Sequence, residues 1–148
     1  MPQLNLKAAC LAGLASGTAY AITAEIDNRL SGQNLDDLKL LGRPLVKSAK
    51  YAKLAGVPVH LLNSIVIASI FPMVRRVLPG SGVVQGMAFA TIENTVLYPV
   101  AAFEHMHPGI QRGEIDRYFT LKAYLLSIPR HLAFGATLGF LYDRLNRA

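Results

Sequence analysis

The sequence predicts an all-α membrane protein, a bundle of four transmembrane helices built from two tandem helical hairpins. Apolar residues make up 52% of the chain and charged residues 16%, whereas an average soluble domain has about 25% charged residues. Residues 54–74 contain no charged side chain, although a soluble amphipathic helix would show a charged face every three or four residues. That stretch has the roughly 20 apolar residues that a membrane span needs. The alternative is a soluble all-α bundle with very apolar helices.

Two of the predicted spans lie in the first half of the chain. The first covers residues 6–26, and its apolar stretch ends at Glu25 and Asp27. The second covers residues 58–77. We expect it to begin at Pro58, because proline suits the first turn of a helix.

The other two predicted spans lie in the second half. The third covers residues 82–103, contains Glu93 as its one charged residue, and has a kink at Pro99. The fourth covers residues 118–145 and is broken or bent at Pro129. Both prolines would remove a helical hydrogen bond, so we expect neither helix to be straight.

Between the first two spans, residues 34–56 predict an amphipathic helix at the membrane interface. Its basic side chains recur every three or four residues, which on a helix forms one stripe: Lys39, Arg43, Lys47, Lys50 and Lys53. Such a helix can lie on a membrane surface with its stripe against anionic lipid. A solvated linker helix is the alternative.

The two halves of the chain share a pattern, which predicts a duplication within a single domain, with one repeat in residues 1–80 and the other in 81–148. Two motifs recur in the same order, 69 and 71 residues later: Gly13-x-x-x-Gly17 as Gly82-x-x-x-Gly86, and Pro58-x-His60-Leu61 as Pro129-x-His131-Leu132. Each copy holds two spans, so both copies have the same orientation in the membrane.

Glycines spaced by four residues give three helices a face of small side chains: Gly13 and Gly17, Gly82 and Gly86, Gly135 and Gly139. This GxxxG spacing lets membrane helices approach closely. It predicts tight packing within the bundle, or contact with a second copy of the chain or a larger membrane complex.

Ionisable and polar side chains inside predicted spans form the candidate site, because such groups are costly in a bilayer and commonly functional. Its members are Glu93, Arg130, His131, Asn63, His60 and Glu25. The simplest interpretation is a structural ion pair between Glu93 and Arg130 at similar depth. A second interpretation is a transport or proton-handling protein that uses Glu93, Arg130 and His131.

A third interpretation is a bundle that holds haem or a metal ion. His60 and His131 occupy equivalent positions in the two repeats and could act as axial ligands, with Glu25 and Glu93 as nearby carboxylates. The spacing matches no established metal-binding signature, so no cofactor is predicted and the identity of any metal stays open.

The sequence shows no nucleophile elbow, P-loop, paired CxxC or dinucleotide fingerprint, so we do not expect an enzyme. The net charge is +6, but the basic residues are not interleaved with aromatic residues as in a nucleic-acid-binding surface. This pattern favours a lipid bilayer over nucleic acid as the partner. We expect a multi-pass protein of the inner (plasma) membrane with a structural or accessory role. Counting basic residues favours a cytoplasmic location for the first and third connections between spans.

The second half also carries short motifs that resemble small bacterial multi-pass membrane proteins, which are generally uncharacterised. The motifs are Leu78-Pro-Gly, Glu93-Asn94 before Tyr-Pro, His107-Pro108, and Arg130-His131-Leu with the later Phe134-Gly and Leu138-Gly. The resemblance implies a membrane location and no particular activity, substrate or cofactor.

Overall fold

A computed structural model describes residues 5–147, and within that range the chain is helical and has no strand. The all-α prediction is therefore confirmed for the described residues. The elements, in order, are α1 (Leu6–Ser31), α2 (Asp37–Gly42), α3 (Ala49–Val74), η1 (Arg75–Val77), α4 (Gly82–Leu97), η2 (Tyr98–Met106), α5 (Pro108–Gln111) and α6 (Leu121–Leu145).

The first helix is longer than predicted. Asn5 caps α1, because its side-chain oxygen accepts a hydrogen bond from the Ala8 backbone N–H at 2.9 Å. The helix continues past its apolar stretch to Ser31 and ends at Gly32, whose φ of 66° is the left-handed conformation that suits glycine at a helix end. The added turns bring Asp27 and Asn28 into the helix, which matters for the site below.

The second predicted span begins at the wrong residue. Helix α3 starts at Ala49, so Pro58 lies inside the helix and not in its first turn. The predicted amphipathic helix over residues 34–56 is split rather than continuous: α2, a turn that contains Pro44 and the start of α3 divide the segment, as the proline allows. Its basic residues therefore do not share one helix face.

The basic side chains of that segment have different environments. Lys39 and Arg43 face Glu114 in the later connection, where Arg43 Nε donates to the Glu114 carboxylate at 2.7 Å. Lys53 binds Glu25 at 2.8 Å, while Lys47 and Lys50 are exposed. Only part of the predicted stripe is therefore free to meet a membrane surface.

Pro99 and Pro129 affect their helices differently. Helix α4 changes at Tyr98 into the 3₁₀ helix η2, in which Pro99 lies in the first turn. Pro129 lies inside α6, which remains one continuous helix from Leu121 to Leu145. Thr120 caps α6 by accepting a hydrogen bond from the Ala123 backbone N–H at 3.1 Å.

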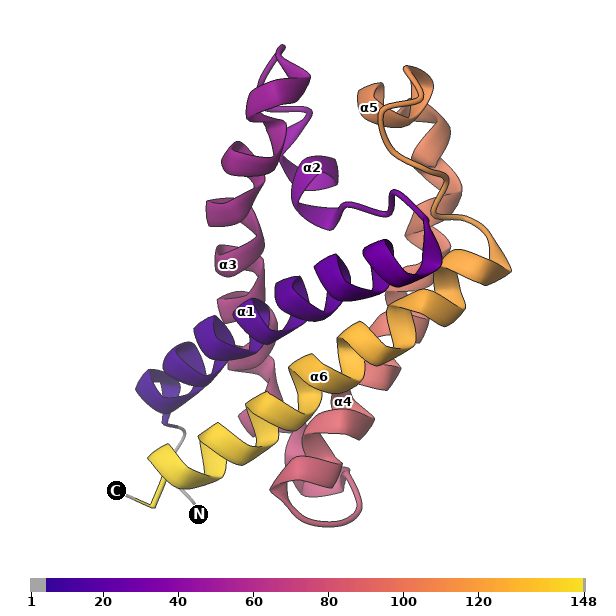
Figure 1. The fold of residues 1–148 in the computed structure, drawn as a ribbon. Coiled ribbons are helices and arrows are strands. Elements are labelled where there is room, and N and C mark those ends of the chain that lie inside the picture. The colour runs from indigo at the N-terminus through magenta and orange to yellow at the C-terminus, as the bar shows by residue number, and fades with distance from the viewer. Residues whose placement is uncertain (1–4, 148) are drawn as a thin grey trace.

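The first and last helices of the chain, α1 and α6, lie side by side and run antiparallel (Figure 1). Helices α3 and α4 meet near the turn that joins them and spread apart toward α2 and α5 (Figure 1). That turn, the start of α1 and the end of α6 lie at one end of the molecule, and α2 and α5 lie at the other (Figure 1).

Small residues bring the helices of each half into close contact. A side chain at Gly13 would lie 2.7 Å from Ala68 Cβ, and one at Gly17 would lie 2.8 Å from Ser64 Cβ, so α1 packs closely on α3. In the second half, Gly82 and Gly86 of α4 face Gly139 and Gly135 of α6. An added Cβ at Gly86 would meet the Gly135 backbone, and one at Gly82 would meet the Asp143 side chain and the Gly139 carbonyl oxygen. These faces are therefore occupied within the chain.

Large apolar side chains lie mostly on the outside of the fold, and small or polar ones lie inside. The core contains Ala9, Ala12, Ala52, Ala68 and Ala90 at 0% exposure, and Arg130 is the largest fully buried side chain. Two helices, Leu6–Ser31 and Ala49–Val77, are long and apolar enough to cross a membrane. Only 33% and 28% of their most apolar windows are buried, less than expected for the core helix of a soluble protein.

Candidate functional site

Arg130 is the centre of a buried ionic network. Its Nε donates to Asp27 Oδ2 at 2.6 Å, and its Nη1 donates to Asp37 Oδ2 at 2.7 Å. Further hydrogen bonds reach Asp27 again, the Asn28 side chain and the Leu35 carbonyl. Arginine has five N–H donors, and here all five have protein partners. Arg130 therefore ties α6 to the end of α1 and the start of α2.

The structure pairs Arg130 with two aspartates, where the sequence predicted Glu93. Side chains on a helix lean toward its N-terminus, and α4 and α6 run antiparallel. Arg130 therefore extends toward the end of the molecule that holds α2, while Glu93 leans the other way. Similar depth in two antiparallel helices did not bring these two side chains together.

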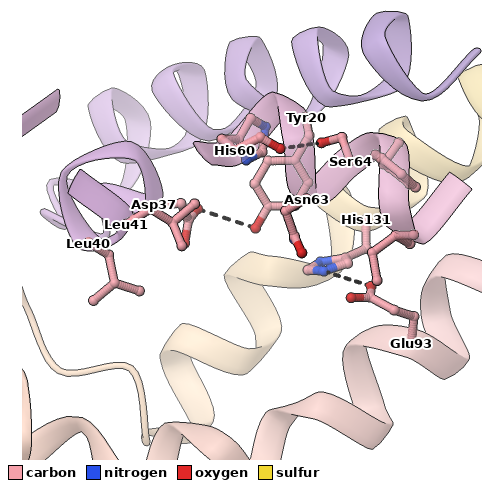
Figure 2. A pocket seen from close by; sticks show the side chains of 11 residues that line it. Tyr20, Asp37, Leu40, Leu41, His60, Asn63, Ser64, Glu93 and His131 are labelled. Atoms are coloured by element: carbon pink, nitrogen blue, oxygen red, sulfur yellow. Dashed lines mark hydrogen bonds and ion pairs between the residues drawn. The ribbon is translucent and has the colours of Figure 1, made fainter. Parts of the chain in front are cut away.

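Glu93 pairs instead with His131, the next residue of α6. His131 Nε2 lies 3.3 Å from Glu93 Oε2 (Figure 2). His131 Nδ1 lies 2.9 Å from the Ser127 carbonyl. Because a carbonyl only accepts, Nδ1 must carry a proton. Nε2 then faces the Glu93 carboxyl group, and a proton on either partner would join the two in an ion pair or a hydrogen bond. The pair is therefore a candidate site for an exchangeable proton.

Tyr20 lies between the two histidines that the sequence singled out. Its ring centroid is 5.4 Å from that of His60 and 5.0 Å from that of His131. Its hydroxyl donates to Asp37 Oδ2 at 3.2 Å (Figure 2). His60 Nε2 bonds the Gly17 carbonyl at 2.9 Å, so both imidazoles have ring nitrogens engaged by backbone carbonyls.

This arrangement does not suit the haem or metal interpretation. The Tyr20 ring separates His60 from His131, so the two imidazoles do not converge on one ion. Within residues 5–147, no group of three or more His, Cys, Asp or Glu side chains could hold a metal ion. Of the remaining predicted members, Asn63 is exposed but lines the same cavity as Glu93 and His131 (Figure 2), whereas Glu25, 43% exposed, binds Arg29 and Lys53 at the surface.

Two cavities flank the Glu93–His131 pair. One, of about 150 Å³, lies among α1, α2, α3, α4 and α6 and is drawn in Figure 2. The other, of about 300 Å³, extends toward η2 and the start of α6. Both are lined by Tyr20, Asp37, Leu40, Glu93 and His131. We call the two together the polar cleft, and the second the tyrosine cavity.

Residues 5–148, which include the whole polar cleft, match a family of unknown function, DUF6789. The chain belongs to this family. No curated protein and no solved structure matches the chain. Family membership thus assigns no activity, in keeping with the resemblance to uncharacterised proteins.

The tyrosine cavity takes its name from four side chains in its lining, Tyr20, Tyr98, Tyr118 and Tyr124. The hydroxyl oxygen of Tyr118 is buried and has no hydrogen-bond partner within the described residues. Burial and the nearby Asp37 carboxylate raise the pKa of Tyr118 well above its ordinary value, so this hydroxyl keeps its proton at neutral pH.

Glu104 holds the segment that carries Tyr118. Its carboxylate accepts hydrogen bonds from the backbone N–H groups of Tyr118 and Phe119 and from Arg117 Nε. Burial raises the pKa of Glu104, but these hydrogen bonds, that of Phe119 first, outweigh it and lower the pKa below its ordinary value. Glu104 is therefore a buried anion, and its hydrogen bonds hold the backbone of Tyr118 in place.

Sequence reasoning missed Asp27, Asp37, Tyr20 and Tyr118 as members of the site. Asp27 marks the end of the first apolar stretch in the sequence, and Asp37 lies in the polar segment after it, so neither belongs to a predicted span. The useful signal was the charge of Arg130. A buried arginine needs carboxylates within reach of its own long side chain, and that side chain points toward its helix N-terminus.

Proposed function

We propose that the protein is a multi-pass integral membrane protein that handles protons at the Glu93–His131 pair. In this proposal, α1, α3, α4 with the start of η2, and α6 cross the bilayer. The apolar side chains on the outside support it: Leu62, Val66, Val96 and Val100 are each more than half exposed. Contact of these apolar side chains with lipid tails costs no free energy, whereas their exposure to water is unfavourable.

The position of the polar connections supports an end of the molecule that faces water. The connections that hold α2 and α5 bind each other through polar contacts, such as the Asn34 backbone N–H with Asp116 at 2.7 Å. They lie at one end of the molecule (Figure 1). Positive-inside counting favours that end in the cytoplasm, with Lys47 and Lys50 near anionic lipid of the inner membrane.

The close contacts between helices support an origin by duplication. Gly13 faces Ala68 as Gly82 faces Gly139, and these are the pairs that the two sequence offsets relate. Under a two-fold relation, α3 and α4 would pack as closely as α1 and α6 do. They spread apart instead (Figure 1), and the polar cleft lies on the side where the repeats differ.

The observation that carries the proton-handling function is the 3.3 Å contact between Glu93 and His131 beside a cavity. Tyr20 from α1, Asp37 from α2, His60 from α3 and Arg130 from α6 are the titratable or charged groups around the pair. Arg130 has all its donors engaged, and His60 is bonded to a carbonyl. In this proposal the pair shares one exchangeable proton, which the cavity makes accessible.

An accessory role in a larger complex is less well supported. The sequence favoured it because of exposed small-residue faces, but those faces contact one another inside the chain. A dimer or complex would therefore need a different surface, and we base the proposed function on the polar cleft.

The experiment is a proton-flux assay in liposomes that contain a pH-sensitive dye. After a pH jump outside, wild-type vesicles should equilibrate faster than protein-free vesicles, and Glu93→Gln should abolish the difference. Glu25→Gln is the matched control, because it removes a surface carboxylate from another predicted span. Equal rates for wild-type protein, Glu93→Gln and empty vesicles would overturn the proposal, as would extraction of the protein from membranes without detergent.

A further inference from the structure

The interior of the protein carries an unbalanced negative charge. Arg130 supplies one positive charge against the two carboxylates of Asp27 and Asp37. In the proposed function, Glu93 and His131 share one proton and are neutral as a pair. One negative charge thus remains, and Asp37 and Glu93 both line the tyrosine cavity. A buried charge without a counter-ion is costly, so the cavity favours a cation.

Arg130, His131, Asn94 and Ser127 also line the cavity, and the remaining wall is aromatic and apolar. The four tyrosines are joined in the lining by Leu35, Leu40, Leu97, Ala101 and Ala123. Tyr98 is held by ring contacts at 4.8 Å to Tyr124 and 5.6 Å to Phe119, and its hydroxyl donates to the Thr120 carbonyl at 2.9 Å. Rigid aromatic rings beside carboxylates are a setting in which organic ammonium ions bind through cation–π attraction.

An inorganic cation fits this wall poorly. Calcium takes six to eight oxygen ligands and magnesium about six, and no group of His, Cys, Asp and Glu in residues 5–147 is arranged for a metal. By contrast, methyl or methylene groups on nitrogen would match the leucine and alanine side chains. A volume of about 300 Å³ is at the lower end of small-molecule pockets, which limits the ligand to a small one.

The buried hydroxyl of Tyr118 is the independent sign of a ligand. Its oxygen is buried and meets no partner within hydrogen-bond distance in the described residues, although the Asp37 carboxylate is near enough to affect its ionisation, and Tyr118 lines this cavity. Buried hydroxyls are normally hydrogen-bonded, because an unpaired one costs free energy. A ligand with a polar group beside its cationic centre would supply the missing partner.

We propose that the tyrosine cavity binds a small organic cation, an alkylammonium or quaternary ammonium compound that carries a hydroxyl or similar polar group. The inference names the ligand class for the cleft and so rests on the proposed function above. The ammonium group lies near Asp37 and Glu93 with its alkyl groups against the tyrosines, and the polar group meets the Tyr118 hydroxyl.

The test is isothermal titration of the full-length protein in detergent with choline and with 3,3-dimethylbutan-1-ol, in which carbon replaces the charged nitrogen. Choline should bind at least tenfold more tightly than this neutral isostere. Equal binding of the two, or no binding of choline, would overturn the inference. The result does not depend on proton flux, so failure here and failure of the proposed function are distinguishable.

Two variants of Tyr118 test the geometry. Tyr118→Phe keeps the ring and removes the hydroxyl, so choline affinity should fall a few-fold, while tetramethylammonium affinity should be unchanged. Tyr118→Leu removes the ring and should weaken both cations tenfold or more. Unchanged choline affinity in both variants would contradict the assigned site. If Tyr118→Leu fails to fold, as judged by circular dichroism, the comparison of wild type with Tyr118→Phe still decides the outcome.

Discussion

His131 Nε2 lies 3.3 Å from Glu93 Oε2, across the interface between α6 and α4. The same imidazole donates from Nδ1 to the Ser127 carbonyl one turn earlier in its own helix. That second hydrogen bond fixes which nitrogen faces the carboxyl group. In the proposed function the protonation of Glu93 and of His131 is one event, and this can be tested without any transport assay.

The first prediction concerns the tautomer of His131. We expect ¹⁵N spectra of the protein in micelles to show a proton on Nδ1, both in the wild type and in Glu93→Gln. The glutamine amide can donate to a bare Nε2, so the fold should be retained while the shared proton is lost.

His60 is the internal control, because its hydrogen bond goes to the Gly17 carbonyl. Its signals should be the same in both proteins. A neutral His131 with its proton on Nε2 would contradict the assigned arrangement.

The second prediction concerns Arg130. Arg130→Met leaves Asp27 and Asp37 as buried, unpaired carboxylates, so the free energy of unfolding should fall by about 3–5 kcal/mol. Arg130→Lys keeps the charge but has three donors on one nitrogen and cannot reproduce the fork, so an intermediate loss is expected. Denaturant unfolding in mild detergent would measure both.

Arg29→Met is the matched control, because Arg29 is 77% exposed and pairs with Glu25 at the surface. Its loss should cost at most about 1 kcal/mol. Similar losses for Arg29→Met and Arg130→Met would show that the buried network does not stabilise the fold.

The apolar helices could be predicted from the sequence, because composition and periodicity report directly on helices of this kind. Their ends could not. The apolar stretch of α1 stops near Ala24, yet the helix continues to Ser31, since Asp27 and Asn28 are held there by Arg130. Likewise α3 extends back through Pro58 to Ala49, because α2 packs on its first turns through Gly42 and Gly56.

The members of the candidate site were partly predictable, and their pairing was not. Glu93, Arg130 and His131 could be identified because charge is rare in apolar helices. Which of two adjacent residues faces α4 depends on the rotation of α6, and one residue on a helix turns the side chain by about 100°. The sequence pattern does not fix that rotation, so Arg130 was assigned the partner that His131 has.

The third prediction uses two glycines in equivalent close contacts. Gly86→Ala would direct its methyl group at the Gly135 backbone, which cannot move aside without separating α4 from α6. Gly17→Ala would meet the side chain of Ser64. Overpacking of this kind typically costs about 1–3 kcal/mol, and Gly86→Ala should be at the upper end.

The second substitution Ser64→Gly provides the control, since it removes the atoms that the alanine at position 17 would meet. Gly17→Ala should regain stability when combined with Ser64→Gly, and Gly86→Ala should not. Equal recovery of both variants in thermal unfolding would be inconsistent with the contacts described.

The fourth prediction concerns Glu104 and the stability of the protein in acid. Its folded-state pKa is lowered from the ordinary value, so its contribution to stability is fully present above the unfolded-state pKa of about 4.3. That contribution is lost as the pH falls through the folded-state pKa, because the folded state must then take up a proton. Glu104→Gln should lower stability at pH 7 by about 1.5–3 kcal/mol, typical of hydrogen bonds to a charged group.

The difference between wild type and Glu104→Gln should therefore be constant from pH 7 to pH 5 and should shrink below about pH 4. Circular dichroism melts at pH 7, 5, 4 and 3 would measure it, with Glu25→Gln as a surface carboxylate control. Because Glu104 also holds the backbone of Tyr118, Glu104→Gln should weaken choline binding at neutral pH. A stability difference that persists unchanged at pH 3 would contradict this prediction, because it would mean that Glu104 stabilises the segment through packing and not through its charge.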